Sequence, residues 1–304
     1  MSPQIVFMGS PEFALPTLEE LHRNYKVVGV VTQPDRPSGR GRKPQPCAVK
    51  MLAQELKLPV FQPESLRKLS AVTELAKWKP DLIVVAAFGQ ILPKAVLEMP
   101  DKGCLNVHAS LLPLWRGASP IQAAIANGDE QTGVTIMQMD EGMDTGNILA
   151  QRSVPIRPGT TAPELSNQLA YLGARTLIEV LPAYLCGTLA AIPQDDSRKT
   201  FAPKLSKENS ILDLQLSAQK LLNQIHAYQP WPGAVFDWQG KRIKILETHA
   251  HPTFECEPGG HYLVNGLPAL GTGEGLLVLD SLQPEGKKPM DGKSFLNGHP
   301  DWLD

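Results

Sequence analysis

The chain has 304 residues, 42% of them hydrophobic, which supports a packed core and excludes a wholly disordered protein. Its formal net charge of −2 excludes a surface that is basic throughout, so a nucleic acid would have to bind a local patch. The four cysteines stand far apart with no CxxC pair, which argues against zinc and dithiol motifs, and we expect no metal.

The first half of the chain alternates strand patterns with helix patterns. Short apolar runs predict strands, and apolar residues near helical spacing predict helices. The predicted strands are 4–9, 26–32, 82–87, 104–108 and 134–139, and the predicted helices are 13–24, 51–56, 71–78 and 163–185. This alternation predicts an open α/β sheet of parallel strands, with ligands bound beyond the carboxyl ends of the strands.

The second half of the chain has a different rhythm. A polar stretch at 191–208 predicts a linker between a catalytic domain at 1–190 and a smaller domain at 209–304. In the smaller domain we expect one helix and several short strands separated by Gly and Pro, as in a small β-barrel or sandwich. The helix is predicted at 216–226, and the strands at 234–238, 241–247 and 275–282.

Two polar residues lie on the predicted strand at 104–108. Asn106 and His108 are two residues apart, so an amide and an imidazole share one face near the carboxyl end of the strand. Acyl transfer needs such donors, because negative charge develops on the carbonyl oxygen. On this spacing alone, a buried structural pair inside a sheet is the more common explanation.

A loop with two glycines follows the predicted strand at 134–139. Its sequence, D-E-G-M-D-T-G, contains Gly142 and Gly146, which permit a tight loop that presses backbone against a ligand. The carboxylate of Asp144 is placed to hydrogen-bond His108, orient its ring and favour the imidazolium form. An ordinary acidic turn is the alternative on spacing alone.

A basic loop occupies residues 33–43. It is rich in Pro and Gly, and it contains one acidic residue and four basic ones, Arg36, Arg40, Arg42 and Lys43. Because it follows a strand, we expect it to overhang the ligand-binding edge of the sheet. Flexible basic loops bind phosphate backbones in a salt-dependent manner. A solvated surface loop is the alternative.

Motifs of several other enzyme classes are missing from the sequence. The strand-to-helix turn at 8–13 has one glycine and no GxGxxG, and neither a phosphate loop nor a GxSxG elbow occurs. A dehydrogenase, a nucleotide hydrolase and an α/β-hydrolase are therefore disfavoured. No apolar run approaches the ~20 residues of a membrane span, and no signal peptide precedes the first strand, so we expect a cytoplasmic protein without membrane contact.

Taken together, these residues resemble the folate-dependent formyltransferases. Asn106, His108 and Asp144 match the catalytic Asn, His and Asp of that family in order and context. The runs 110–113 and 116–117 are similar to its signature. The resemblance implies a Rossmann-like catalytic domain joined to an OB-like β-barrel. No nucleophilic Ser or Cys motif accompanies these residues, so we expect the acceptor amine to attack the formyl carbon directly, without a covalent enzyme intermediate.

The resemblance is greatest to members of the family that formylate methionyl-tRNA, and it spans nearly the whole chain. It implies 10-formyltetrahydrofolate as donor, initiator methionyl-tRNA as acceptor and a product used in translation initiation. The tRNA-binding residues it implies are Arg36, Arg40, Arg42 and Lys43. The folate-binding residues it implies are Phe88, Gly89, Gln90, Ile91, Leu92, Ser110, Leu111, Leu112, Pro113, Asp140 and Met143.

The expected partners carry one difficulty and leave two alternatives. Residues 209–304 hold seven Lys or Arg against eleven Asp or Glu, so tRNA contacts there must use local patches such as 241–244 and 287–288. A formyltransferase for a small amine would share the three catalytic residues without needing the basic loop. A non-catalytic RNA-binding protein would not require those three residues. We expect a monomer.

Overall fold

The computed structural model describes residues 3–38, 43–252 and 255–303. The chain divides into two compact units. The first comprises the chain up to Pro120, Gln131–Pro155 and Ser166–Ala202, and the second comprises Ile121–Glu130, Ile156–Leu165 and the chain from Pro203. Residues 191–202, which the sequence indicates as linker, therefore cluster with the first unit.

The first unit is built on a seven-stranded sheet with the order β10-β9-β7-β6-β1-β2-β5. Its strands are β1 (Gln4–Gly9), β2 (Lys26–Val31), β5 (Val60–Phe61), β6 (Leu82–Ala86), β7 (Cys104–His108), β9 (Gln131–Gln138) and β10 (Ile148–Pro155). The five strands from β5 to β7 are parallel. The Rossmann-like α/β core is thus confirmed.

The prediction of a wholly parallel sheet was wrong at β9. This strand pairs antiparallel with β7 on one side and with β10 on the other. Antiparallel neighbours can be joined by a short loop, whereas a parallel return needs a crossover of a dozen or more residues. The short connection between β9 and β10 fits the first case. The apolar pattern of β9 predicts burial but does not encode its direction.

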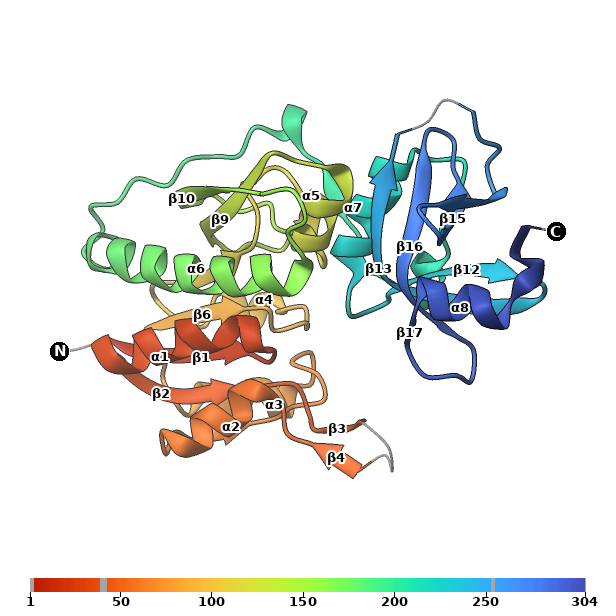
Figure 1. The fold of residues 1–304 in the computed structure, drawn as a ribbon. Coiled ribbons are helices and arrows are strands. Elements are labelled where there is room, and N and C mark those ends of the chain that lie inside the picture. The colour runs from red at the N-terminus through yellow and green to blue at the C-terminus, as the bar shows by residue number, and fades with distance from the viewer. Residues whose placement is uncertain (1–2, 39–42, 253–254, 304) are drawn as a thin grey trace. The chain divides into compact units, whose positions relative to one another are not determined.

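Helices cover both faces of this sheet because successive strand residues point to opposite sides. Ile5 and Phe7 pack into one core with α1, α2 and α6, whereas Val6 and Met8 pack into another with α3 and α4. In Figure 1, α1 and α6 lie in front of the sheet. These helices are α1 (Leu15–Asn24), α2 (Ala48–Glu55), α3 (Leu69–Ala76), α4 (Lys94–Leu97) and α6 (Ala162–Leu185).

The second unit is built on a six-stranded antiparallel sheet with the order β12-β13-β16-β15-β14, and β17 pairs with β16. Its elements are α7 (Ala218–Tyr228), β12 (Ala234–Trp238), β13 (Lys241–His251), β14 (His261–Val264), β15 (Leu267–Gly271), β16 (Leu276–Pro284), β17 (Met290–Asp291) and α8 (Gly292–Gly298). The predicted smaller β domain is confirmed. Among the residues described, no pairing joins β12 to β14, so the sheet does not close into a full barrel.

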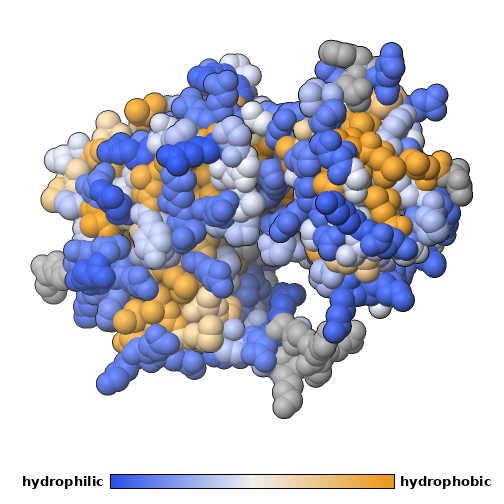
Figure 2. Space-filling model, in the orientation of Figure 1, coloured by the Kyte–Doolittle hydropathy of each residue, from blue (hydrophilic) through white to orange (hydrophobic). Residues whose placement is uncertain are grey.

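Local sequence explains where the helices of the second unit begin. The Ser217 hydroxyl caps α7 by accepting from the Lys220 N–H, and the Asp291 carboxylate caps α8 by accepting from the Ser294 N–H. The core between helices and sheet includes the fully buried side chains of Phe295 and Trp302. Hydrophilic residues cover much of the visible surface of the molecule, with apolar patches between them (Figure 2).

Candidate active site

Strand β7 presents Asn106 and His108 on one face, as their spacing predicts. Leu105, before them, and Val107, between them, point to the other face and enter the core with α6. Asn106 is 9% exposed and His108 is 5% exposed. In register, Asn106 lies between Val85 of β6 and Met137 of β9, well inside the sheet. The backbone is thus paired on both sides at Asn106, and at His108 it is paired with Thr135 of β9.

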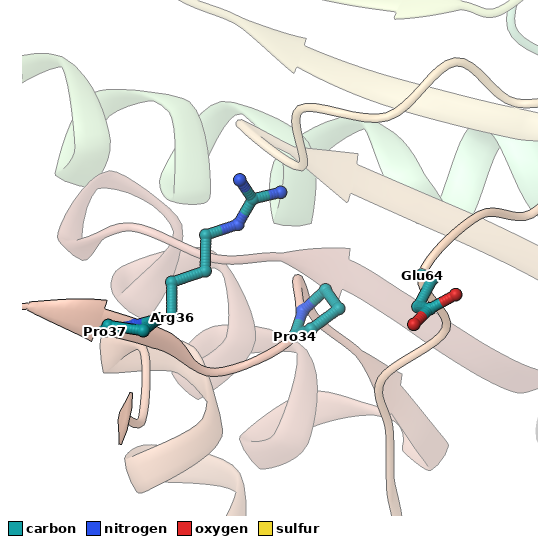
Figure 3. A pocket seen from close by; sticks show the side chains of 4 residues that line it. All are labelled: Pro34, Arg36, Pro37 and Glu64. Atoms are coloured by element: carbon teal, nitrogen blue, oxygen red, sulfur yellow. The ribbon is translucent and has the colours of Figure 1, made fainter. Parts of the chain in front are cut away.

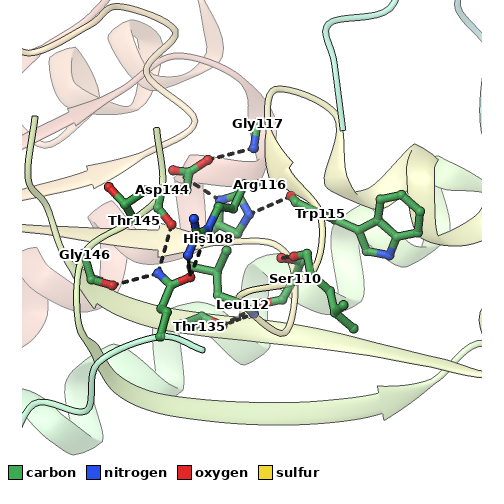
Figure 4. A network of polar contacts seen from close by, with 12 residues as sticks. His108, Ser110, Leu112, Trp115, Arg116, Gly117, Thr135, Asp144, Thr145 and Gly146 are labelled. Carbon is green, nitrogen blue, oxygen red and sulfur yellow. Dashed lines mark hydrogen bonds and ion pairs between the residues drawn. The ribbon is translucent and has the colours of Figure 1, made fainter. Parts of the chain in front are cut away.

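His108 lies between two hydrogen-bond acceptors. Its Nδ1 is 3.7 Å from the Oδ1 of Asp144, and its Nε2 is 3.2 Å from the carbonyl oxygen of Trp115 (Figure 4). A carbonyl oxygen only accepts, so Nε2 is the donor of that bond. The Asp144 carboxylate on the Nδ1 side and the Trp115 carbonyl on the Nε2 side together orient the ring.

Asp144 is fixed by its backbone as well as by its carboxylate. Its Oδ2 accepts a 2.8 Å hydrogen bond from the Gly117 N–H, which leaves Oδ1 turned toward His108 (Figure 4). Its φ of 54° lies in the left-handed region, which is uncommon for a residue with a Cβ. Such a conformation persists only where the surrounding structure holds it. The hydrogen bond from Gly117 and the conformation of the loop therefore fix the position of Asp144.

The Asn106 amide is available for a ligand. Within the described part of the chain, its side chain has no hydrogen bond to protein. Its amide atoms are not among the described buried side-chain atoms that lack a hydrogen-bond partner, so they keep contact with solvent, where a ligand can reach them. A developing oxyanion is one partner that an amide N–H can stabilise.

The first group of predicted folate residues follows β6. Phe88 and Leu92 are buried in the core. The side-chain amide of Gln90 bonds to the backbone of Leu66 and Pro63. The Ile91 side chain is exposed. These contacts give the segment a defined shape with one apolar side chain in solvent. Gly89 has a positive φ of 77°.

The loop after β9 lies beside this segment. Lys94 Nζ, at the start of α4, is 3.5 Å from Glu141 Oε1 of the loop that carries Asp140 and Met143. Met143, like Ile91, is a large apolar side chain exposed to solvent. The structure therefore brings two of the three predicted folate-binding segments together, and their contact with folate remains a prediction.

The third predicted folate segment, 110–113, is shaped by its own hydrogen bonds. The Ser110 hydroxyl donates to the Leu114 carbonyl at 2.5 Å, and the Thr135 hydroxyl donates to the Ser110 carbonyl at 2.6 Å. Gln151 donates to the carbonyl of Leu112 at 2.8 Å. Ser110 and Leu112 are buried, and Leu111 and Pro113 are half-buried. The polar atoms of Ser110 thus serve the loop itself.

The basic loop is a hairpin of β3 (Arg36–Ser38) and β4 (Lys43–Gln45). Its base is anchored at Asp35, which bonds to Lys50 at 2.6 Å and to Gln62 at 2.9 Å. The hydrogen bond from Lys50, and then that from Gln62, holds the pKa of Asp35 below its ordinary value. The predicted residues Arg40 and Arg42 lie outside the described residues, and of Lys43 only the backbone is described.

A pocket of about 700 Å³ opens at the base of this hairpin. It is lined by Pro34, Arg36, Pro37 and Glu64, and Figure 3 shows the extended Arg36 side chain on the opposite side of Pro34 from Glu64. Arg36 is exposed, so its guanidinium is open to a phosphate. Of the predicted tRNA-binding cations, it is the one whose side chain is described.

Sequence reasoning misses Gln194, Arg116 and the Gly117 N–H as neighbours of the site. Gln194 contacts Asp144 and Arg116 across separations of 50 and 78 residues. No local spacing or motif encodes contacts at that range. Arg116 and Gly117 stand out only as part of the family signature, without an indication of what they touch.

Gly146→Ala is expected to lower turnover about tenfold or more and to destabilise the fold by about 1–3 kcal/mol. A Cβ at Gly146 would lie 1.8 Å from the Gln138 carbonyl oxygen, so the loop that carries Asp144 must shift. Turnover and thermal melting would be compared with Gly298→Ala, whose Cβ meets nothing within 4 Å. Equal turnover in the two variants would contradict a loop held this tightly.

Two further features bear on what the site can bind. No group of three or more His, Cys, Asp or Glu side chains that could hold a metal ion occurs among the described residues. Of the helices described, none combines the length and the apolar character that a membrane span requires.

Comparisons with known proteins agree on one kind of enzyme. Residues 4–181 match the family model for formyl transferase, and residues 204–300 match the model for the formyl transferase C-terminal domain. The chain is 47% identical over 98% of its length to the methionyl-tRNA formyltransferase of Roseiflexus castenholzii, of which it covers 96%. It is 49% identical over 97% of its length to that of a Synechococcus strain, of which it covers 95%.

A solved structure shares the fold at lower identity. HypX from Aquifex aeolicus, in complex with tetrahydrofolic acid, aligns with 97% of this chain at a TM-score of 0.61 and 18% identity. This chain spans about half the length of HypX, since it covers 47% of that protein. At this identity the likeness concerns the fold alone.

Proposed function

The chain belongs to the formyl transferase family, and from that premise we propose that it moves the formyl group of 10-formyltetrahydrofolate onto the amino group of initiator methionyl-tRNA. Relatives at 44–49% identity over nearly the whole chain are methionyl-tRNA formyltransferases. The product is N-formylmethionyl-tRNA, the substrate of translation initiation. We further propose that the protein works as a cytoplasmic monomer.

The reaction is a direct transfer between two nitrogens. The free amine attacks the formyl carbon, a new C–N bond forms, and the carbonyl electrons move onto oxygen. When the carbonyl re-forms, the bond to the folate nitrogen breaks, and the proton lost by the amine replaces the formyl group on that nitrogen. Holding both large substrates in line supplies much of the acceleration, because translational and rotational freedom is lost beforehand.

The roles of the three polar residues follow from their geometry. Asn106 and His108 would donate hydrogen bonds to the oxyanion, and for His108 this requires Nε2 to turn from the Trp115 carbonyl toward the substrate. Asp144, 3.7 Å from Nδ1, would hold the ring and help to carry the proton from amine to folate. A positioned proton-transfer group contributes typically ~10²–10⁴-fold.

The observation that carries this proposal is the unpaired Asn106 amide beside the His108–Asp144 pair. The test is incubation of the purified protein with the formylated folate and, in parallel, initiator methionyl-tRNA, glycinamide ribonucleotide and an amino-sugar nucleotide. We expect N-formylmethionine after hydrolysis of the tRNA product, and little transfer to the small amines. Transfer to a small amine alone would make that amine the acceptor, and binding of tRNA without transfer would leave an RNA-binding protein.

Arg36→Ala is expected to raise the KM for tRNA several-fold and to leave the KM for folate unchanged. The exposed guanidinium lies at the base of the basic hairpin, where a phosphate contact would release a counterion. Losing one such contact reduces the salt slope of binding by about one. The affinity of the variant and of the wild-type protein for tRNA would be measured as a function of salt concentration.

The matched control for this variant is Lys77→Ala. Lys77 is an exposed cation on the last turn of the α3 region, paired with Glu74 and outside the hairpin. Its removal is expected to leave both the salt slope and the tRNA KM as they are. Equal effects of the two substitutions would show that the hairpin contributes only general charge.

A further inference from the structure

The Gln194 side chain bonds to the loop that carries Asp144. Its Nε2 donates to the carbonyl oxygens of Asp144 at 2.9 Å and of Gly146 at 2.7 Å. An amide nitrogen has two hydrogens, so both are used on this one loop. These bonds hold the backbone of Asp144, whose φ of 54° is uncommon.

Arg116 holds the other end of the Gln194 amide. Its Nε and one terminal nitrogen donate to Gln194 Oε1 at 3.1 and 2.7 Å, and the same terminal nitrogen donates to Asp196 Oδ1 at 2.7 Å. Arg116 is 2% exposed, a rare burial for a guanidinium. The hydrogen bond from Arg116, ahead of its charge, lowers the pKa of Asp196. A buried cation with these partners fixes the Gln194 side chain in one orientation.

The rest of the same segment fixes the carboxylate of Asp144. Strand β11 (Phe201–Ala202) pairs with β8 (Arg116–Gly117), and the Gly117 N–H donates to Asp144 Oδ2. Upstream, Ile192 and Ile148 exchange two backbone hydrogen bonds of 2.8 Å directly after the loop ends. Residues 192–202 thus hold the Asp144 loop in three ways. Ile192 pairs with Ile148 at the end of the loop, and Gln194 bonds to two carbonyls of the loop. Strand β11 pairs with β8, whose Gly117 bonds to the Asp144 carboxylate.

We propose that Gln194 is a positioning residue for formyl transfer, which with Arg116 behind it holds Asp144 in the orientation that faces His108. The segment 192–202 is then part of the catalytic unit and not a passive connection to the second unit. This proposal rests on the function proposed above. Gln194 contacts no substrate in it and acts through Asp144.

The decisive experiment is a double-mutant cycle between Gln194→Met and Asp144→Asn, measured in single turnover. Methionine keeps the size of glutamine and removes all four hydrogen bonds. Gln194→Met alone is expected to lower the transfer rate about 10–100-fold with little change in either KM, because a displaced carboxylate no longer orients His108. In the Asp144→Asn background the same change is expected to cost less than about threefold. Losses that simply add would overturn the proposal.

A second variant separates the loop contact from the Arg116 contact. Gln194→Glu keeps an acceptor for Arg116 but has no hydrogen for the carbonyls of Asp144 and Gly146. We expect a rate loss comparable to that of Gln194→Met, and a wild-type rate would overturn the proposal. The control is Gln4→Met, which removes an amide-to-carbonyl bond to Lys79 at the amino end of β1.

Hydrogen exchange distinguishes failure of this proposal from failure of the proposed function. In the free protein, Gln194→Met is expected to speed amide exchange across residues 139–148 about threefold or more, with no change in β6 or β7. This readout needs no substrate. If the wild-type protein formylates no acceptor, the proposed function is refuted. Amide hydrogen exchange in the free protein then still tests whether Gln194 holds the loop. Unchanged exchange in that segment would overturn the positioning role.

Discussion

Asp144→Asn is expected to lower the rate of formyl transfer by about 100-fold or more while folate binding and the fold are kept. The asparagine can still accept the Gly117 N–H through its amide oxygen, so the loop has reason to stay in place. What is lost is the negative charge 3.7 Å from His108 Nδ1, which orients the ring. Single-turnover rates, folate affinity and thermal melting would be measured on the same preparation.

The matched control for this prediction is Asp101→Asn. Asp101 is an exposed carboxylate just before β7, at the end of that strand opposite to His108. It is expected to leave the rate unchanged. A nearly normal rate for Asp144→Asn would remove this carboxylate from the mechanism.

Asn106→Leu is expected to lower kcat by about 10²–10³-fold, the usual cost of losing one oxyanion donor. Leucine has a similar size, and no described residue loses a hydrogen bond to the Asn106 side chain, so the melting temperature is expected to stay the same or rise. The KM for each substrate should change little, because the oxyanion exists only as the reaction proceeds.

The control for Asn106→Leu is Asn24→Leu, at the exposed end of α1. Asn24 bonds to Glu20 on its own helix and lies outside the site. A kcat within about threefold of wild type for Asn106→Leu would show that the amide does not face the reacting carbonyl.

Much of the first unit could be predicted from local pattern. Strand β1 has the predicted bounds because it is a short apolar run. Strand β7 also has them, because Cys104, Leu105 and Val107 give it an apolar pattern between two turns. Helix α2 begins at Ala48, three residues before its predicted start, since Ala48 and Val49 continue the helix beyond the strongest part of the pattern. Such differences at element ends are normal where no cap residue marks the boundary.

Strand direction and sheet closure could not be predicted in the same way. Burial patterns are alike for parallel and antiparallel strands, so nothing local marks the reversal at β9. This reversal places the carboxyl end of β9 beside the start of β7, since Gln138 pairs with Leu105. The loop must therefore run back along the sheet for Asp144 to reach His108.

In the candidate site, too, local sequence predicts some contacts and does not predict those between distant segments. Asn106 and His108 share a face because of their spacing, which is a property of any strand. That Asp144 lies beside His108 was expected from the loop sequence and the family resemblance, and the structure places them 3.7 Å apart. Gln194 and Arg116 had no such signal, because their contacts join segments far apart in the chain. The catalytic and binding roles of all these residues stay predictions.

The measurement that tests the central claim most directly is a structure of the protein with a formylated folate that cannot transfer its formyl group. The formyl oxygen is predicted to lie about 2.7–3.1 Å from the Asn106 side-chain nitrogen, with His108 turned toward the same oxygen and Asp144 beside the ring. A formyl group bound away from Asn106, with His108 still bonded only to the Trp115 carbonyl, would contradict the account.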